Sequence, residues 1–398
     1  MSAVPAGYKQ TEVGVIPEDW AVRYLADVSR KITDGDHVTS LRTSHGYYLL
    51  SARNVLSGRI DVSDVDYVGA AEYRRMKQRC GPEAGDILIS CSGTIGRVAV
   101  VLSGFECVLV RSAALAKIDH GLADSVFLQF WLQGNKAQGQ IAGSVNQGAQ
   151  PNLFLNHIER LACPHPPLPE QRAIAAALSD VDALLAKLDQ LIAKKRDLKQ
   201  ATMQQLLTGQ TRLPGFSGAW EVKRLGDVGT CLRGVSYRGD SDLSAYDTNS
   251  TKRLLRSNNV QDATVVTADI QFVNAERVSA KQLLQEGDIL ICMANGSRAL
   301  VGKAGFFNVR DGYEYTFGAF MGCFRSNSAD ANAIFVFYLF QTGRYRNYVN
   351  NLLAGSSINN LTPTSIESLE FSVPSHPEQT AIATVLSDMD AELAALEA

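Results

Sequence analysis

The side chains of this chain that could do chemistry are mainly hydrogen-bonding groups in short polar stretches. Arginine, amide and hydroxyl groups on loops can donate and accept hydrogen bonds toward a bound molecule, so their chemistry is that of recognition. In the first half of the chain they are Asp36, His37, Thr39, Arg53, Asn54, Ser92, Thr94, Arg97, Asn146, Gln147 and Gln150. In the second half they are Ser236, Tyr237, Arg238, Arg256, Asn258, Asn259, Asn295, Ser297, Arg298, Ser357 and Asn359.

Common catalytic and metal-binding patterns are missing from the sequence. It contains no NPPY-like methyltransferase motif, no Walker A loop, no HExxH and no clear nuclease carboxylate-lysine cluster. His37 lies beside Asp34 and Asp36, but no second histidine or cysteine is suitably spaced to form a site with it. We therefore expect a solvated loop histidine and no metal site.

The composition is that of an ordinary globular protein. A chain of 398 residues with 45% hydrophobic and 20% charged residues is expected to form two or three domains. It has neither a long apolar run nor a signal peptide at its N-terminus, so we expect no membrane span and a cytoplasmic location. The seven cysteines are scattered without a CxxC pair, and we expect them to be reduced and buried.

The net charge of −3 argues weakly against a nucleic-acid partner, because neutralising phosphates requires lysine and arginine. Its distribution weakens that objection. The last 25 residues hold five acidic and no basic side chains, whereas the two large segments before them are nearly balanced. A local basic face remains possible.

The chain repeats one plan twice. PPLPEQRAIAAALSDVD at 166–182 and PSHPEQTAIATVLSDMD at 374–390 agree at eleven of seventeen positions. GDILI at 85–89 returns at 287–291, and the Trp-x-Val-x-x-Leu-x-Asp-Val pattern at 20–28 returns at 220–228. Each half combines short apolar strands with one helical segment, at 125–141 and at 334–353, so the expected class is α+β.

The segment 170–207 predicts a single long helix. No glycine or proline interrupts it, and 38 residues at 1.5 Å each give a rod of roughly 57 Å. Its apolar residues follow a coiled-coil seam: Ile174, Leu178, Val181, Leu185, Leu188 and Ile192, widened by Ala177, Leu184, Leu191 and Leu198. We expect antiparallel pairing with the second helix, which starts at Glu378; the alternative is a core helix of one domain.

Three stretches resemble the specificity subunits of type I restriction-modification systems. They are GYKQTEVGVIPEDW at 7–20, PPLPEQRAIAAALSDVDALLAKLDQLIAKK at 166–195 and MQQLLTGQTRLPGFSGAW at 203–220. The resemblance covers the whole chain in order. It implies a first target-recognition domain at 1–166, a spacer helix at 167–209, a second target-recognition domain at 210–373, and the start of a second helix at 374–398 that is expected to be truncated.

The resemblance also implies a function. Each domain would read one part of a split sequence in double-stranded DNA, and the antiparallel helices would fix the gap. The chain itself would be non-catalytic and bind no cofactor. Two modification subunits would methylate adenine with S-adenosylmethionine, and restriction subunits would use ATP and Mg²⁺. Self-association through the short second helix is a further possibility that the resemblance leaves open.

Under this interpretation the polar stretches are expected to contact DNA. Arginine and lysine match guanine in the major groove, and asparagine and glutamine match adenine. Arg53 and Arg256 stand out because they occupy similar positions, and both could equally hold phosphate. The structural alternative is that the asparagines form turns and caps. The rival function is a duplicated scaffold that recruits helices and binds no DNA.

Overall fold

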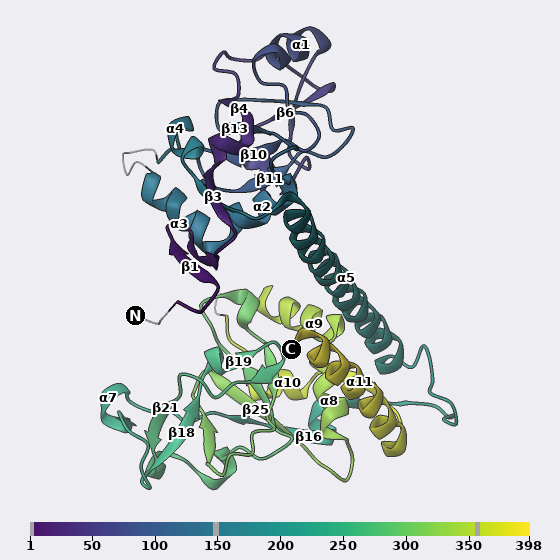
Figure 1. The fold of residues 1–398 in the computed structure, drawn as a ribbon. Helices are drawn as coiled ribbons and strands as arrows, with labels where there is room; N and C mark the ends of the chain where they lie inside the picture. The colour runs from purple at the N-terminus through teal and green to yellow at the C-terminus, as the bar shows by residue number, and fades with distance from the viewer. Residues whose placement is uncertain (1–3, 146–150, 355–358) are drawn as a thin grey trace. The chain divides into compact units, whose positions relative to one another are not determined.

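The computed structural model describes residues 4–145, 151–354 and 359–398. The chain divides into two compact units, residues 1–186 and 187–398. Figure 1 labels their elements, and each unit is described by itself. The long helix α5 (Leu168–Leu207) contributes its first half to unit 1 and its second half to unit 2.

Unit 1 contains two four-stranded sheets, in the orders β11-β10-β13-β4 and β12-β6-β9-β5. The first comprises β4 (Ser29–Asp34), β10 (Ile87–Ser90), β11 (Val98–Val100) and β13 (Ala113–Ile118). The second comprises β5 (Arg42–Thr43), β6 (Tyr47–Leu50), β9 (Asp66–Val68) and β12 (Cys107–Leu109). Three two-stranded ribbons complete the strands: β1 (Tyr8–Thr11) with β2 (Gly14–Pro17), β3 (Ala21–Tyr24) with β14 (Ala162–His165), and β7 (Val55–Leu56) with β8 (Arg59–Ile60). The helices are η1 (Leu25–Val28), η2 (Ala52–Asn54), α1 (Ala70–Arg79), α2 (Ser125–Gln133), α3 (Asn135–Ser144) and α4 (Leu155–Glu159).

Unit 2 repeats both strand orders and extends the first sheet by two strands, β20 and β19. Its sheets run β19-β20-β23-β22-β25-β16 and β24-β18-β21-β17. The strands are β16 (Gly229–Arg233), β17 (Leu243–Ser244), β18 (Thr251–Leu255), β19 (Val260–Gln261), β20 (Thr264–Val265), β21 (Gln271–Asn274), β22 (Ile289–Cys292), β23 (Ala304–Phe306), β24 (Tyr315–Phe317) and β25 (Met321–Ser326), with β15 (Glu221–Arg224) pairing β26 (Glu370–Val373). The helices are α6 (Leu225–Val228), α7 (Gly239–Asp242), η3 (Ser257–Asn259), η4 (Ala275–Arg277), η5 (Ala280–Gln282), η6 (Arg298–Leu300), α8 (Ala333–Leu339), α9 (Gly343–Ala354), α10 (Pro363–Glu367) and α11 (His376–Glu397). The predicted α+β class with a duplicated plan is confirmed.

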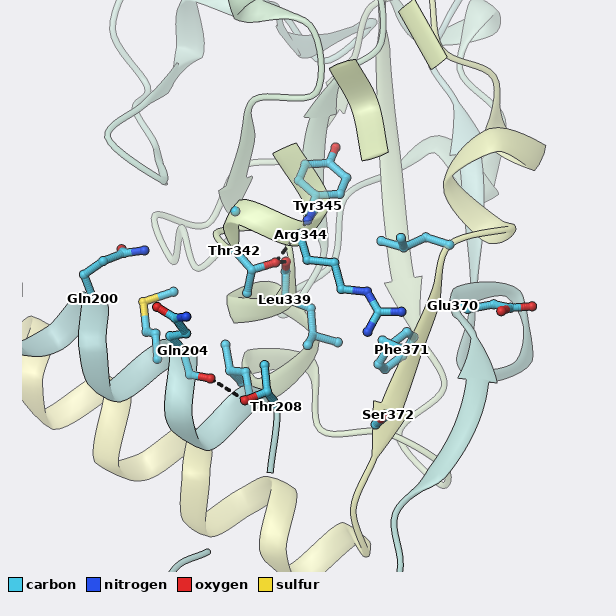
Figure 2. A pocket seen from close by; sticks show the side chains of 14 residues that line it. Gln200, Gln204, Thr208, Leu339, Thr342, Arg344, Tyr345, Glu370, Phe371 and Ser372 are labelled. Carbon is cyan, nitrogen blue, oxygen red and sulfur yellow. Dashed lines mark hydrogen bonds between the residues drawn. The ribbon is translucent and has the colours of Figure 1, made fainter. Parts of the chain in front are cut away.

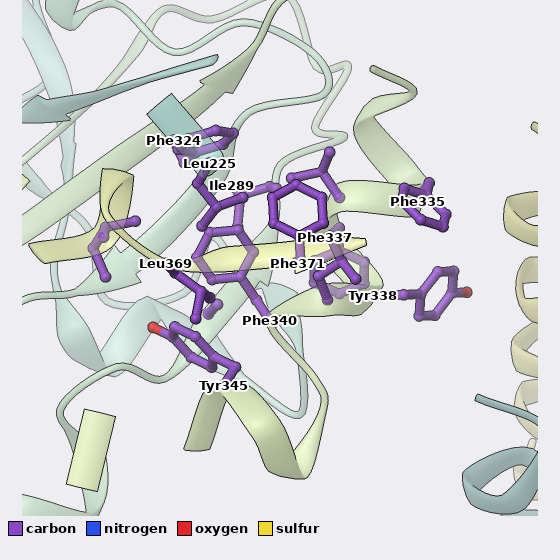
Figure 3. Packing of buried hydrophobic residues seen from close by; sticks show 14 of the residues in the cluster. Leu225, Ile289, Phe324, Phe335, Phe337, Tyr338, Phe340, Tyr345, Leu369 and Phe371 are labelled. Atoms are coloured by element: carbon purple, nitrogen blue, oxygen red, sulfur yellow. The ribbon is translucent and has the colours of Figure 1, made fainter. Parts of the chain in front are cut away.

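The repeated GDILI segment forms the central strand of each unit's first sheet. Alternate side chains of a strand point to opposite faces. In β22, Ile289 and Ile291 therefore join the cluster that contains the helices, while Leu290 packs in the cluster on the other face. Figure 3 shows the helix-side cluster, which Ile289 of β22 shares with Phe324 of β25, Phe337 of α8 and Phe371 of β26. Burial on both faces explains why this strand is apolar throughout.

The helical segments predicted at 125–141 and 334–353 are each two helices, so those predictions were wrong in detail. In unit 1, α2 stops at Gln133, and Gly134 has an extended backbone (φ −71°, ψ 154°) before α3 begins. In unit 2, the Thr342 hydroxyl accepts a hydrogen bond from the N–H of Tyr345 at 3.2 Å and caps the start of α9. An extended glycine interrupts the helix in unit 1, and a side-chain cap starts a new helix in unit 2.

The repeated glutamine of the two helix entrances holds each helix to its unit. Gln171 Oε1 accepts the N–H of Asp124 at 2.9 Å, and its Nε2 donates to the carbonyl of Pro166 at 2.9 Å. Gln379 repeats this with the N–H of Asn332 at 2.9 Å and the carbonyl of Pro374 at 3.0 Å. Both glutamines are buried. The motif therefore fixes the direction in which each helix leaves its sheet.

Within unit 2, α11 runs antiparallel to the last turns of α5 (Figure 1). Lys195 Nζ lies 2.6 Å from Glu392, and Arg196 Nη2 lies 2.7 Å from Glu397. Arg196, Lys199 and Arg212, which follows α5, pair in turn with Glu397, Asp390 and Glu378, so partner numbers fall as numbers in this segment rise. These ion pairs join α11 to the part of α5 that belongs to unit 2. The predicted seam residues Leu178, Val181 and Leu185 are exposed.

The predictions about buried side chains are also confirmed. All seven cysteines are free and buried. Burial raises the pKa of the Cys163 thiol to about 12. Tyr48 stacks on Phe105 with ring centroids 5.1 Å apart, and Phe307 is buried against Tyr315. Both aromatic pairs therefore pack in or against the hydrophobic clusters.

Candidate nucleic-acid interface

An open pocket of about 640 Å³ in unit 2 brings together four of the predicted site residues. Ser236 and Tyr237 follow β16, and Arg256 and Asn258 lie at the turn after β18. The parallel pairing of β18 with β24 and the bridge between Val235 and Gly318 bring these two segments together. Four residues separated along the sequence thus face one hollow, which we call the unit 2 pocket.

Arg256 does not project freely from this pocket. Its Nη2 lies 3.0 Å from Asp269 Oδ2 and 3.2 Å from the Asp269 carbonyl. Asn258 Nδ2 donates to the same Oδ2 at 2.9 Å. The arginine charge is therefore partly offset before any ligand arrives.

Asn295 contacts the lining of the unit 2 pocket, and Asn359 contacts the residue that follows Asn295. Asn295 Nδ2 approaches the hydroxyl of Ser257 at 3.4 Å, and Asn359 Nδ2 approaches the carbonyl of Gly296 at 3.4 Å. The Asn295 Oδ1 also accepts the N–H of Ser297 at 2.9 Å, which shapes the turn. These long side-chain contacts leave the amide groups able to exchange partners.

The other two basic residues predicted in unit 2 are exposed. Arg298 Nη2 donates to the carbonyl of Asn350 at 2.8 Å, which ties η6 to α9. Arg238 is exposed at the start of α7, where its N–H is held by the carboxylate of Asp242 at 2.7 Å. The unit 2 pocket does not include either residue.

Unit 1 has the corresponding loops, and its arginine is also paired with aspartate. Arg53 Nη2 lies 3.1 Å from Asp66 and its Nη1 lies 3.6 Å from Asp64. Ser92 forms a bridge with Asn152, as Ala294 does with Asn360 in unit 2. Thr39 and Thr94 are exposed and Arg97 is half-buried. These residues remain predictions for DNA contact.

His37 takes part in an ion-pair group and in no metal cluster. Its Nε2 lies 2.7 Å from Asp34 Oδ2, and Arg79 reaches the other oxygen of Asp34 at 3.0 Å. Among residues 4–145, 151–354 and 359–398, no three potential ligands from histidine, cysteine, aspartate and glutamate gather closely enough to hold a metal ion.

For three residues the prediction of a DNA contact is wrong, because their side chains are buried. Asn54 Oδ1 accepts the N–H of Ser51 at 3.0 Å, and its Nδ2 donates to the carbonyls of Asp61 and Asp64. Asn259 makes the same three contacts in unit 2. Both asparagines are 1% exposed or less, so their amides hold a turn and cannot reach a base.

Asp36 is the third residue for which the predicted DNA contact is wrong. It is 7% exposed and pairs with Arg75. Desolvation raises the pKa of this carboxyl, but hydrogen bonds from Arg75 and from the backbone outweigh that effect and hold the pKa below its ordinary value. Asp36 is therefore a structural anion.

The correspondence between Arg53 and Arg256 was also wrong by two positions. Ser51 and Arg256 are the cap residues of equivalent turns, with Asn54 and Asn259 at the third position inside. Arg53 therefore corresponds to Asn258. The two arginines enter the same region from different backbone positions.

Comparison with known proteins assigns these two similar units to one family. A model of the "Type I restriction modification DNA specificity domain" matches residues 17–195 and again residues 218–398. The chain belongs to this DNA specificity family. The two matches cover both copies of the repeat.

Other members of the DNA specificity family show the same relationship over shorter stretches. The chain is 32% identical over 182 residues to the type I restriction enzyme StySPI specificity subunit of Salmonella potsdam, and 31% identical over 182 residues to the EcoKI specificity subunit of Escherichia coli K12. Each match covers 45% of this chain and 38% of the relative. The chain thus spans well under half the length of these two relatives.

A solved structure matches the fold over nearly the whole chain. The crystal structure of a type I restriction-modification S subunit from M. genitalium aligns over 95% of this chain and 91% of its own, with a TM-score of 0.58 and 15% identity. At this identity the likeness concerns the fold alone.

Sequence reasoning missed three residues in these specificity-domain loops. Phe320 lines the unit 2 pocket although 71% of it is exposed, and Asp269 lines it with a left-handed backbone (φ 51°). Arg111 is exposed in unit 1, and its N–H donates to the carbonyl of Asp36 at 3.1 Å. For Phe320 the sequence offered one signal, an aromatic residue directly after the two small residues Gly318 and Ala319.

Four predicted residues, Asn146, Gln147, Gln150 and Ser357, lie outside the described residues.

A second hollow, of about 390 Å³, lies in unit 2 between the last turns of α5, the start of α9 and β26 (Figure 2). Gln200, Gln204 and Thr208 line it from the helix side, and Arg344 and Phe371 from the other side. None of the predicted recognition residues lines it. We assign it no part in the specificity-domain interface.

No helix in the described part of the chain combines the length and the apolarity that crossing a bilayer requires.

Proposed function

We propose that this chain supplies DNA sequence specificity to a type I restriction-modification complex. Each unit would read one part of a two-part duplex site, and the paired helices would set the unspecified gap. The observation that carries this proposal is the repetition of one recognition plan in a chain of the DNA specificity family. The two units have sheets with corresponding strand orders, and the equivalent loops after β6 and β18 each carry an arginine and an amide side chain.

The loop residues suit two kinds of contact. Arg53 and Arg256 match either phosphate or the guanine edge, and Asn258 and Asn295 match the adenine edge. Asp66 and Asp269 hold the two arginines in place before binding. In unit 1, exchange of the Arg53–Asp66 ion pair for DNA contacts would favour correct sequences over phosphate alone.

The chemistry would be done by partners. We propose that two modification subunits methylate adenine with S-adenosylmethionine and that restriction subunits use ATP and Mg²⁺, while this chain is non-catalytic. The exposed seam on α5 at Leu178, Val181 and Leu185 would accept a helix of a modification subunit or of a second copy.

The scaffold alternative is not favoured. A scaffold would need neither two loops of matched donors and acceptors nor membership in a family of DNA specificity domains. It predicts that the chain and its complexes bind no duplex with sequence preference.

The proposal is tested by binding a pool of random duplexes to the full chain together with its modification subunits. We expect enrichment of one two-part sequence, and an affinity for it that falls steeply as salt rises. Equal binding of all duplexes, or no binding at low salt, would contradict the proposed function.

A further inference from the structure

Asp269 stands where a ligand in the unit 2 pocket would meet it. It lies between β20 and β21, lines the pocket with Tyr237 and Phe320, and has 79% of its side chain exposed. Its φ of 51° is in the left-handed region, which aspartate tolerates better than most residues. A charged group is thus displayed at the edge of a predicted recognition surface.

The carboxylate is held by one oxygen only. Arg256 Nη2 at 3.0 Å and Asn258 Nδ2 at 2.9 Å both donate to Oδ2. Among the residues that the structure describes, no donor reaches Oδ1. With Oδ2 occupied by two donors and most of the side chain exposed, Oδ1 is the oxygen that can accept a hydrogen bond from a ligand.

The chemistry of the second oxygen restricts what it can bind. An ionised carboxylate only accepts hydrogen bonds, and DNA phosphates offer no donor. In the major groove the donors are the amino groups of cytosine N4 and adenine N6. Arg256 offsets the negative charge, so that the carboxylate can approach DNA with less repulsion from the phosphates.

We propose that Asp269 is a specificity-determining residue that selects a base carrying an exocyclic amino group, cytosine or adenine, at one position of the half-site read by unit 2. Arg256 and Asn258 act as its positioning residues, and Phe320, exposed in the same pocket, covers the contact from water. This inference rests on the proposed function and names the base chemistry that one pocket recognises.

The test uses the full chain with its modification subunits and a library of random duplexes. The wild-type complex should select cytosine or adenine at one position, and the selected base distinguishes the two. Asp269→Gly removes the carboxylate and suits the left-handed backbone, so it should lower the preference at that position by about ten- to a hundredfold and leave every other position unchanged. Asp269→Asn, which keeps the shape of the side chain, should weaken the same position and no other.

Asp262→Gly is the matched control, because Asp262 is also exposed, acidic and left-handed (φ 44°) but does not line the unit 2 pocket. It should leave the selected sequence unchanged. If both Asp269 variants fold and select the wild-type sequence, or lose affinity equally for all sequences, the inference is wrong while the proposed function stands. A wild-type complex that selects no two-part sequence would overturn the proposed function itself.

Discussion

At the residue scale, the same side-chain types serve turns and recognition, and burial separates the two roles. Asn54 and Asn259 have the composition of recognition residues, yet both are locked in buried turns. Asp269 and Phe320 have no distinctive sequence pattern, because their roles depend on strands that meet only in the fold. The sequence therefore indicates which loops matter better than which side chains in them reach out.

The buried glutamine of the helix entrance gives a prediction about stability. Gln379→Ala should lower the free energy of unfolding by about 1–3 kcal/mol, because the N–H of Asn332 and the carbonyl of Pro374 lose a buried partner. Urea unfolding measures this. Gln204→Ala, at an exposed position of α5, is the control and should change stability by under about 0.5 kcal/mol.

The buried thiols give a prediction about pH. Since burial raises the pKa of Cys163 to about 12 from an ordinary value of 9.0, the unfolded chain releases this proton first as pH rises. The contribution to stability is complete below pH 9 and is lost between about pH 9 and 12.

Cys163→Ala should therefore make the decline of unfolding free energy above pH 9 shallower, by up to about 1 kcal/mol per pH unit. Urea unfolding at several pH values compares the two slopes. Equal slopes would show that this thiol does not titrate as its burial requires.

At the element scale, strands and long helices could be predicted, and their interruptions could not. Residues 87–90 and 289–292 form central strands because their apolar side chains face two clusters. α5 is continuous because no glycine or proline breaks it. The breaks fall at Gly134 after α2 and at Thr342-Gly343 after α8, and the apolar spacing that runs across both sites hid them.

Asp390 links α11 to two neighbours within unit 2. It pairs with Lys199 of α5 and accepts a hydrogen bond from the hydroxyl of Tyr338 at 2.7 Å. Asp390→Asn should reduce stability by about 1 kcal/mol, since the site is partly exposed and the ion pair is screened. Asp388→Asn, two residues earlier and exposed, should have a smaller effect in the same urea titration.

At the scale of the whole molecule, the duplication is the feature that the sequence predicted best, because it needs only the comparison of one half with the other. The paired strand orders and the two family matches agree with it. The DNA contacts themselves stay predictions, since they depend on which side chain meets which base.

The proposed spacer role predicts a change in gap length. Four residues inserted near Lys194 would lengthen α5 by about 6 Å. The gap between the two parts of the selected site should then grow by about one or two base pairs, with both parts unchanged, at roughly 3.4 Å per base pair. Selection from random duplexes measures the gap, and an unchanged gap would rule out the spacer role.

The most direct test of the account exchanges residues 210–373 for the corresponding domain of a relative with a different sequence preference. Adenine methylation is then mapped across a genome in the presence of the modification subunits. If each unit reads its own half, one part of the methylated site changes while the other part stays as it was. A change in both parts, or in neither, would contradict the claim that each unit reads its own half.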